Sequence, residues 1–460
     1  MKTNIRFGFL RLTLALAITL VTSFNADIHA KAQDKKGKAK AEIEADPGKA
    51  GGEYYVYEFN DEAVSKAPKG YKPFYISHIG RHGARYALKD EIYESLRDIL
   101  NKAFEDNKLT EKGKELRERY EGFYPNVAYR GGDLTQKGQE QLRTIAGTMY
   151  SRFPEVFKGE TNVEAISTAY PRVILSMYAF LGRLAELDND ISFHTDAGRS
   201  LTYILHPNVT INPNLKEKAS ISKKGQRSAE KFRDATIDTK ALACRFFTDY
   251  KYIEKNYGAW SFIADLRSLA VSSQCLDSSP TSDDFSDMFT KDELYKIWEV
   301  QNYNGYLLMG QSPVGSGMGS NMYSIMLEDI IRKAEKDMAT RKVNLRLRFS
   351  HDTAIMSMLS FMNLNGLGVR VSEPKDVADK WASYTIAMGS NLQLIFYRSK
   401  KKSDILVKVL FNGAEAKLPI NEAAAGFYKW DDFRKHYLKE IERVRPMVEK
   451  YLKSEKIYQD

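Results

Sequence analysis

The sequence predicts an α/β fold that carries a long, mostly α-helical insertion. One observation is that β-rich runs occur towards both ends of the chain, at residues 71–80, 163–167, 345–350, 390–397 and 405–411. The other is that the segment from 200 to 340 has few such runs and is rich in helical patterns and loops. Strands that flank a helical segment indicate one sheet domain, formed by both ends of the chain, with an inserted cap.

The first elements alternate between strand and helix. Residues 71–80 (YKPFYISHIG) are rich in β-formers and end at a glycine. Residues 90–120 are heavily charged and helical in pattern. Residues 135–153 are amphipathic, because apolar side chains recur at helical spacing at Leu142, Ile145, Ala146 and Met149.

Later elements follow the same alternation. A short strand at 163–167 leads to a helix over 172–187, and Pro171 suits the first turn of that helix. Residues 345–350 (LRLRFS) alternate apolar and basic side chains and precede another helix. The rest of the prediction is two strands and a long terminal helix, at 390–397, 405–411 and 430–454. The predicted core therefore comprises residues 53–199 and 341–460, and the predicted cap comprises residues 200–340.

The first 32 residues have the pattern of a secretory signal peptide. Basic residues precede an apolar stretch at 12–24, and Ala30-Lys31-Ala32 offers small residues at the cleavage positions. The apolar stretch is short for a transmembrane span, and an uncleaved signal anchor is the alternative. We therefore expect an exported protein, periplasmic or secreted, without a membrane segment after cleavage. Residues 33–52 are rich in Lys, Ala, Gly and Glu and predict a disordered linker.

The charge balance suits a small anionic substrate. The chain has 69 Lys and Arg residues against 60 Asp and Glu residues, a net charge of +9. This excess is too weak to indicate nucleic-acid binding, and no recognition-helix or zinc-finger spacing accompanies it. Cys244 and Cys275 either pair with each other or remain free thiols, and neither has a neighbouring catalytic partner in the sequence. The oligomeric state stays open.

The segment Arg81-His82-Gly83-Ala84-Arg85 has the clearest chemical pattern. It follows a predicted strand, and ligand sites of open α/β sheets lie at the carboxyl ends of strands. Gly83 permits a tight backbone path that turns the three charged or titratable side chains toward one point. Arginine forks match phosphate oxygens, and a histidine between them can attack phosphorus. The alternative is a surface turn without chemistry.

A metal site is a second alternative for this segment. His78 and His82 are four residues apart, as zinc ligands on a helix face are. Gly80 and Gly83 argue against a helix here, and the two arginines would repel a cation. We therefore expect no metal and no other cofactor, and we expect His78 to pack in or beside the sheet.

Two more segments place compatible groups at strand ends. In Ser350-His351-Asp352-Thr353, Asp352 is suited to protonate a leaving alkoxide, and a helix cap is its alternative role. Arg172 lies in the first turn of a predicted helix, where the helix dipole disfavours a cation. A bound anion would offset that placement. The three strand ends together indicate a phosphate site.

These segments together resemble the histidine acid phosphatases, the large-cap branch of the histidine phosphatase superfamily, which includes acid phosphatases, phytases and multiple inositol polyphosphate phosphatases. The matching features are RHGAR at 81–85, Asp133-Leu134-Thr135 with Gly138, Ser167-Thr168 with Arg172, and His351-Asp352-Thr353. The resemblance implies a mixed, mainly parallel sheet with helices on both faces, an inserted helical cap and a metal-free site. It implies that His82 accepts the phosphate, that Asp352 donates the proton, and that the phosphate is clamped by Arg81, Arg85, Arg172 and His351.

Two departures from the family pattern leave the substrate open. Ala87 stands where the family commonly has proline, which predicts a less rigid loop. The tyrosine after the second arginine, Tyr86, resembles the pattern of the inositol polyphosphate phosphatases, but those usually carry His-Ala-Glu where this chain has His351-Asp352.

The expected function is an exported phosphomonoester hydrolase with a phosphohistidine intermediate, acting on inositol phosphates or on a broad range of phosphomonoesters. A non-catalytic phosphate-binding protein and a phosphomutase are the alternatives.

Other segments have weaker patterns. Gly315–Gly319 (GSGMG) lacks the Lys-Ser/Thr of a P-loop and is expected to be a flexible lip near the site. His194 and His206 are expected to be structural or surface groups. A basic run in the predicted cap is expected to be a solvated face, or alternatively to contact secondary phosphates of the substrate: Lys216, Lys218, Lys223, Lys224, Arg227, Lys231 and Arg233.

Overall fold

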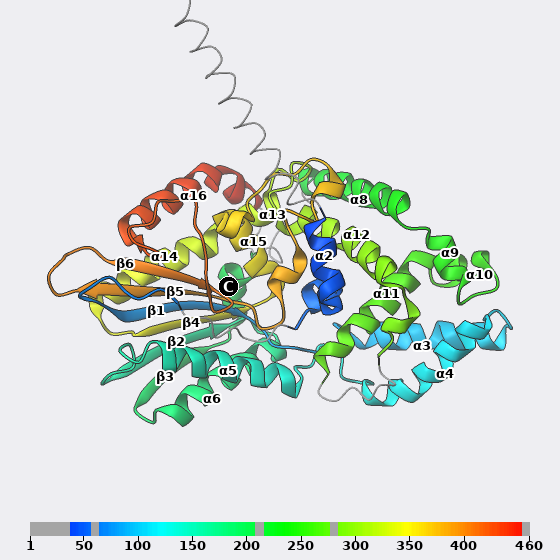
Figure 1. Cartoon of the computed structure of the whole chain (residues 1–460), viewed down its shortest axis with the longest axis horizontal. Helices are drawn as coiled ribbons and strands as arrows, with labels where there is room; N and C mark the ends of the chain where they lie inside the picture. Colours follow the sequence, from blue (N-terminus) through cyan, green and yellow to red (C-terminus); the bar gives the residue numbers. More distant parts are fainter. Residues whose placement is uncertain (1–36, 57–63, 208–215, 277–283, 453–460) are drawn as a thin grey trace, which may run out of the picture.

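In the computed structural model, helices cover both faces of one mixed sheet, and a helical cap adjoins one end of it (Figure 1). The structure describes residues 37–56, 64–207, 216–276 and 284–452. The predicted signal peptide, residues 1–32, lies outside the described residues. Within the described ranges, no helix combines the length and the apolar character needed to cross a membrane.

The sheet has eight strands in the described part of the chain, in the order β3-β2-β4-β1-β5-β6-β7, with β8 paired to β6. The parallel half contains β1 (Tyr71–Arg81), β2 (Thr161–Ser167), β3 (Ile191–Asp196) and β4 (Leu345–Ser350). The antiparallel half contains β5 (Asn391–Ser399), β6 (Leu406–Phe411), β7 (Ala414–Glu415) and β8 (Tyr428–Lys429). The predicted α/β fold with a mixed sheet is confirmed, and β3 is a strand that was not predicted.

Helices cover both faces because the strands present apolar side chains on both. One face packs against α5 (Gln136–Arg152) and α6 (Pro171–Leu187). The other face packs against α14 (Ser324–Thr340), α15 (Asp352–Met362) and α16 (Trp430–Leu452). Figure 1 shows these two groups on opposite sides of the strands. The helices predicted over 135–153 and 172–187 are confirmed by α5 and α6, and the helix predicted over 430–454 is confirmed by α16 up to Leu452, where the described residues end.

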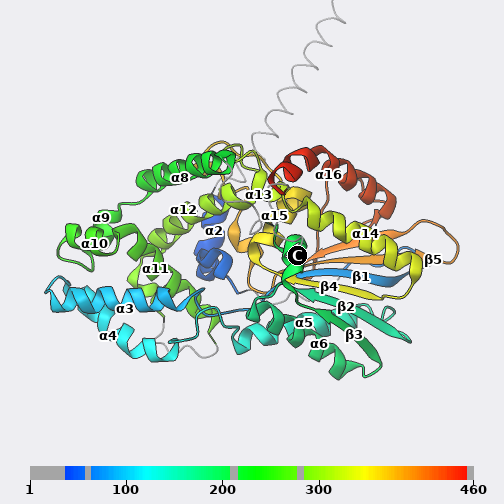
Figure 2. The same cartoon turned by 180° about the vertical axis from the view of Figure 1, so that it is seen from behind.

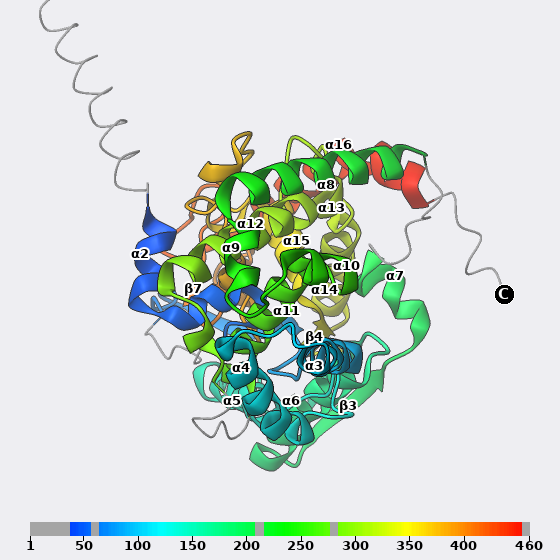
Figure 3. The same cartoon turned by 90° about the vertical axis from the view of Figure 1, so that its right-hand side faces the viewer.

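The cap is assembled from two separate stretches of the chain. Its later helices are α8 (Lys216–Thr236), α9 (Thr239–Cys244), α10 (Tyr250–Asn256), α11 (Ala259–Ser272) and α12 (Lys291–Met309). The charged segment predicted as helix over 90–120 forms α3 (Asp90–Glu105) and α4 (Glu111–Phe123), which share an apolar cluster with α9–α12. Figures 2 and 3 show α3 and α4 on the cap side of the molecule. Helices α13 (Met318–Asn321) and α14, although within 200–340, pack toward the sheet.

Short elements connect these layers. They are α7 (Thr202–Leu205) and the 3-10 helices η2 (Tyr124–Asn126), η3 (Arg199–Leu201), η5 (Ser273–Cys275), η7 (Ser286–Met288), η8 (Leu364–Gly366), η9 (Pro374–Asp376) and η10 (Ser383–Ile386). Cys275 is buried in η5, whereas Cys244 is exposed at the end of α9. Both are free thiols, so the structure has the free-thiol alternative and not a disulfide between them.

The N-terminal segment is helical, and the predicted disordered linker is therefore wrong for residues 37–52. It forms α2 (Lys38–Ala45) and η1 (Pro47–Tyr54). The carboxylate of Asp379 accepts hydrogen bonds from the backbone amides of Gly37 and Ala39 at 2.7 and 2.9 Å. The small side chains that suggested disorder instead allow close packing, since Ala50 is completely buried.

Candidate active site

The three predicted segments meet at the carboxyl ends of three neighbouring inner strands of the sheet. Strands β1, β4 and β2 are adjacent and parallel, and their register aligns Arg81 with Ser350 and Ser167 with Phe349. The residues that follow these strands therefore come together. The ring centroids of His82 and His351 lie 5.8 Å apart.

The loop after β1 is held against the N-terminus of α5. Thr135, the N-cap of α5, donates from Oγ1 to the Ala84 carbonyl at 3.0 Å and accepts from the Gly138 amide at 3.1 Å. A Cβ atom at position 83 would lie 2.2 Å from the Gly138 carbonyl, and one at position 138 would lie 2.2 Å from the Ala84 carbonyl. Both glycines are therefore required by close backbone approach, rather than by the tight turn that the sequence suggested for Gly83.

His82 is buried, and its Nδ1 lies 2.9 Å from the Gly83 carbonyl. A carbonyl oxygen only accepts hydrogen bonds, so Nδ1 carries the proton and Nε2 keeps its lone pair. Burial lowers the pKa of His82 well below its ordinary value, and the charges of Arg81, Arg172 and Arg85 lower it further. The imidazole is therefore neutral, with Nε2 available as a nucleophile.

The three arginines present unused hydrogen-bond donors around this ring. The Nε atoms of Arg81, Arg85 and Arg172 are buried and have no hydrogen-bond partner in the part of the chain that the structure describes. Buried unpaired donors are costly, so this site is suited to receive an acceptor. Three positive charges less the negative charge of Asp352 leave a net positive site, which suits the anionic phosphate group of a monoester.

His351 lies between Arg172 and Thr168. Its Nδ1 is 3.4 Å from Nη2 of Arg172, and its Nε2 is 3.1 Å from Oγ1 of Thr168. A guanidinium only donates, so Nδ1 accepts and Nε2 donates. Burial lowers the pKa of His351 to about 3, with further contributions from His206 and Arg172. His351 is thus a neutral group that orients Arg172.

Asp352 is the first residue of α15, and His351 is the N-cap of that helix. The carboxylate accepts from the Thr353 amide at 2.7 Å and from Nη2 of Arg81 at 3.2 Å. Burial favours the protonated form, but the charges of Arg81 and Arg85 outweigh it and hold the pKa of Asp352 at about 2. The carboxyl group is therefore ionised when no anion is bound.

His206 is a neighbour of the site that sequence patterns did not reveal. Its ring centroid lies 4.9 Å from that of His351, and its Nδ1 lies 2.8 Å from the hydroxyl of Tyr323. Burial lowers its pKa. His206 follows α7, far from the motifs in sequence, and only the fold brings it to the strand ends.

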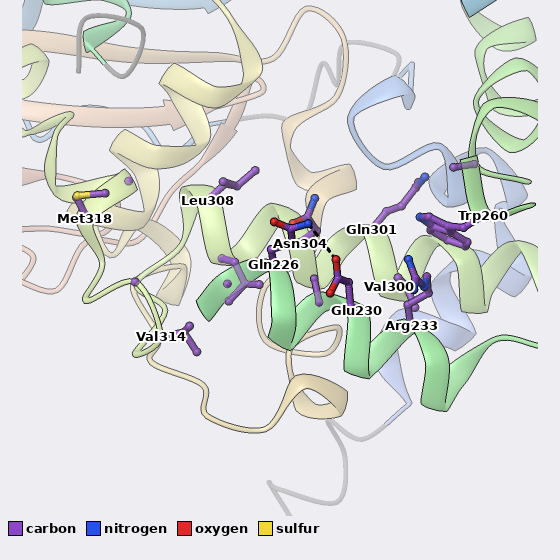
Figure 4. A pocket seen from close by; sticks show the side chains of 16 residues that line it. Gln226, Glu230, Arg233, Trp260, Val300, Gln301, Asn304, Leu308, Val314 and Met318 are labelled. Carbon is purple, nitrogen blue, oxygen red and sulfur yellow. Dashed lines mark hydrogen bonds between the residues drawn. The ribbon is translucent and has the colours of Figure 1, made fainter. Parts of the chain in front are cut away.

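Other candidate segments lie elsewhere. On α8, the side chains of Lys223, Lys224, Arg227 and Lys231 are exposed, while those of Lys216 and Lys218 lie outside the described side chains. Arg233, Gly315 and Gly319 line a cap pocket of about 560 Å³ together with Trp260 and Leu308 (Figure 4). None of the residues predicted to bind or cleave the phosphate lines this pocket. The GSGMG segment, which was expected to form a lip near the site, lines this cap pocket.

His78 does not join the site either. It is buried between the rings of Phe180 and Phe349, at centroid distances of 5.2 and 5.4 Å. This packing agrees with its expected place in the sheet. Among the described residues, no group of three or more His, Cys, Asp or Glu side chains is arranged to hold a metal ion.

Comparison with known proteins identifies the family. A search of curated proteins finds no match. The structure of the Bifidobacterium longum multiple inositol polyphosphate phosphatase in complex with phosphate is similar, with a TM-score of 0.72 and 17% identity over 85% of this chain and 98% of that chain. The D. castellii phytase gives a TM-score of 0.62 and 14% identity over 86% of this chain and 85% of that chain. The Hafnia alvei phytase in complex with tartrate gives a TM-score of 0.54 and 13% identity over 82% of this chain and 98% of that chain.

These similarities show a shared fold. The family itself is shown by a model of the histidine phosphatase superfamily (branch 2), which matches residues 76–412. That range includes all the motif residues at the three strand ends. The chain therefore belongs to the histidine phosphatase superfamily, branch 2.

Proposed function

We propose that this chain is a phosphomonoester hydrolase that works through a phosphohistidine intermediate on His82. The observation that supports it most directly is the set of three buried guanidinium Nε donors, unpaired within the described residues, around a histidine whose Nδ1 faces a carbonyl. Arginine donors bind the non-bridging oxygens and stabilise the charge that they carry in the transition state.

The reaction has two steps. First, Nε2 of His82 attacks phosphorus, an N–P bond forms, and the ester P–O bond breaks. The leaving alkoxide takes a proton from Asp352. Second, water attacks the phosphohistidine and gives a proton to the Asp352 carboxylate, the N–P bond breaks, and inorganic phosphate leaves.

The low pKa of Asp352 requires that its proton arrive with the substrate. A phosphate monoester keeps one proton below a pH of about 6. The bound phosphate offsets the charges of Arg81 and Arg85, which are the main causes of the low pKa, so the proton can pass to Asp352. We therefore expect an acidic pH optimum.

The proposed substrates are inositol phosphates, or a broader set of phosphomonoesters. The similarity in fold to a multiple inositol polyphosphate phosphatase and to phytases supports the first class. A phosphate-binding protein would need neither a nucleophile nor an acid, so His82 and Asp352 argue against that alternative. The proposed location is the periplasm or the exterior of the cell, on the basis of the signal-peptide pattern in residues 1–32.

His82→Ala tests the nucleophile. We expect kcat to fall by at least about 10³-fold for phosphate release from phytate, sugar phosphates and nucleotides, because no other group can accept the phosphoryl group. Inorganic phosphate should still bind in calorimetry. The matched control is His194→Ala on the exposed side of β3, which should keep full activity. If His82→Ala keeps more than a tenth of the wild-type rate, the proposal is wrong.

A further inference from the structure

The N-terminal strap, defined here as residues 37–56, lies between the cap and the core. Its η1 segment packs against α11 and α12 of the cap and against η10 of the core. Figure 1 shows the strap in blue at this junction. The strap therefore adjoins the end of the sheet where the arginines lie.

The strap is anchored by contacts to residues far away in sequence. The side chain of Gln274 donates to the Gly48 carbonyl at 3.2 Å and accepts from the Val56 amide at 3.1 Å. Arg267 donates to the Ala50 carbonyl. At Gly52 the backbone has a φ of 58°, and a Cβ atom would lie 2.9 Å from Oγ of Ser383. The backbone path of the strap is thus closely defined.

One strap carbonyl holds Arg81. Nη1 of Arg81 donates to the Glu53 carbonyl at 2.6 Å and to the Ile386 carbonyl at 2.7 Å, and Nη2 donates to Asp352. These bonds fix the plane of the guanidinium group. The buried Nε atom and one Nη2 hydrogen remain for an anion.

One strap ring holds Arg85. The ring centroid of Tyr54 lies 4.9 Å from Cζ of Arg85. Tyr54 is only 7% exposed and packs in a small apolar cluster with Ala84 of the motif loop, Met388 and Cys275. A buried aromatic face attracts and orients a guanidinium group.

We propose that the strap positions two of the phosphate-binding arginines, Arg85 through the ring of Tyr54 and Arg81 through the carbonyl of Glu53. This inference rests on the proposed function, because it assumes that the arginines bind phosphate. Tyr54 acts through Arg85 and is a positioning residue. The strap also packs on the cap, so the placement of the cap and the geometry of the arginines are coupled.

Tyr54→Leu in the full chain tests this role. The variant removes the ring from beneath Arg85, so we expect the Kd for inorganic phosphate, measured by calorimetry, and the KM to rise about tenfold, with a smaller change in kcat. Tyr54→Phe keeps the ring and removes only the hydroxyl, which also interacts with Arg85, so its Kd and KM should rise less than those of Tyr54→Leu. If the leucine variant does not fold, Tyr54→Met, which fills a similar volume, is measured in the same way.

Asp379→Asn is the control, because it weakens the anchoring of the strap at Gly37 and Ala39 and leaves the contacts of Glu53 and Tyr54 with the arginines unchanged. It should lower the melting temperature and leave the Kd for phosphate unchanged. The inference is overturned if Tyr54→Leu leaves both Kd and KM within about twofold of the wild type, or if Tyr54→Phe loses as much as Tyr54→Leu. A wild-type chain that binds phosphate but releases none from any substrate would refute the proposed function alone, while one that binds no phosphate would overturn both.

Discussion

At the scale of single residues, burial beside fixed positive charge sets the protonation of the site. Burial and the charges of Arg81, Arg172 and Arg85 keep His82 neutral, and the charges of Arg81 and Arg85 also keep Asp352 ionised. The first effect prepares the nucleophile, whereas the second removes the proton that the leaving group needs. A substrate monoanion resolves this conflict, because it brings the missing proton and offsets the positive charge.

Asp352→Asn should therefore affect substrates according to their leaving groups. Inositol or sugar phosphates leave as strongly basic alkoxides, so we expect their kcat to fall by about 10²-fold or more. A nitrophenyl phosphate needs little protonation as it departs and should lose less than about tenfold. The two substrate types are compared in the same variant by steady-state kinetics. An equal loss on both would show that Asp352 positions the site and does not donate the proton.

The site residues differ in how far the sequence could predict them. Local patterns mark five of them: Arg81 ends β1, His82 and Arg85 follow it, and Arg172 and Asp352 lie in the first turns of α6 and α15. The structure brings these side chains together. Their catalytic roles stay predictions. His206 could not be found in this way, because its place beside His351 depends on the path of the chain between β3 and α8 and not on a local pattern.

At the scale of elements, the contact between α5 and the loop after β1 decides the position of the nucleophile. Gly138→Ala should lower kcat/KM by more than about tenfold and destabilise the protein, because its Cβ would lie 2.2 Å from the Ala84 carbonyl and the helix would have to shift. Gly147→Ala is the matched control on the same helix, since its Cβ would meet only the side chain of Arg183 at 3.6 Å. It should keep full activity and stabilise α5 by about 0.5–1 kcal/mol. Kinetics and thermal unfolding of the two variants are compared, and equal effects would contradict the prediction.

Elements with strong local patterns were predictable, and those held by distant contacts were not. The amphipathic period of α5 and the β-rich run of β1 mark these elements without reference to the fold. Strand β3 escaped prediction because it lies at the edge of the sheet with mostly exposed side chains. The N-terminal strap escaped because its order comes from Asp379, Gln274 and Arg267, more than two hundred residues away.

At the scale of the whole molecule, the site lies where the sheet, the strap and the segment formed by α7 and His206 meet. The ring of His206 and the ring of Tyr54 approach the strand ends from two of these parts. Such a site is assembled only when the whole chain is folded. The pH range of activity is therefore limited by the pH range of folding as well as by the chemistry.

His78 lowers the stability of the folded chain at acidic pH. It is buried, neither ring nitrogen has a hydrogen-bond partner within the described residues, and burial together with Arg348 lowers its pKa to about 3. A histidine whose pKa is lower in the folded state is protonated preferentially in the unfolded state. Its contribution to stability is complete above the ordinary pKa of about 6.5 and is lost as the pH falls toward 3.

His78→Leu should remove this loss of stability. Between pH 7 and pH 4 we expect the free energy of unfolding of the wild type to fall by about 3 kcal/mol more than that of the variant, because each pKa unit corresponds to about 1.4 kcal/mol. Urea unfolding at a series of pH values measures the difference, which isolates His78 from the other titrating groups. His194→Leu, at an exposed position on β3, is the control for replacing a histidine of the sheet by leucine, and its free energy of unfolding at pH 7 should stay close to that of the wild type. If the free energy of unfolding depends on pH in the same way in the wild type and in His78→Leu, His78 does not cause the loss of stability at acidic pH. If the two curves diverge, the buried ring of His78 weakens the fold under the same acidic conditions that favour the proposed reaction.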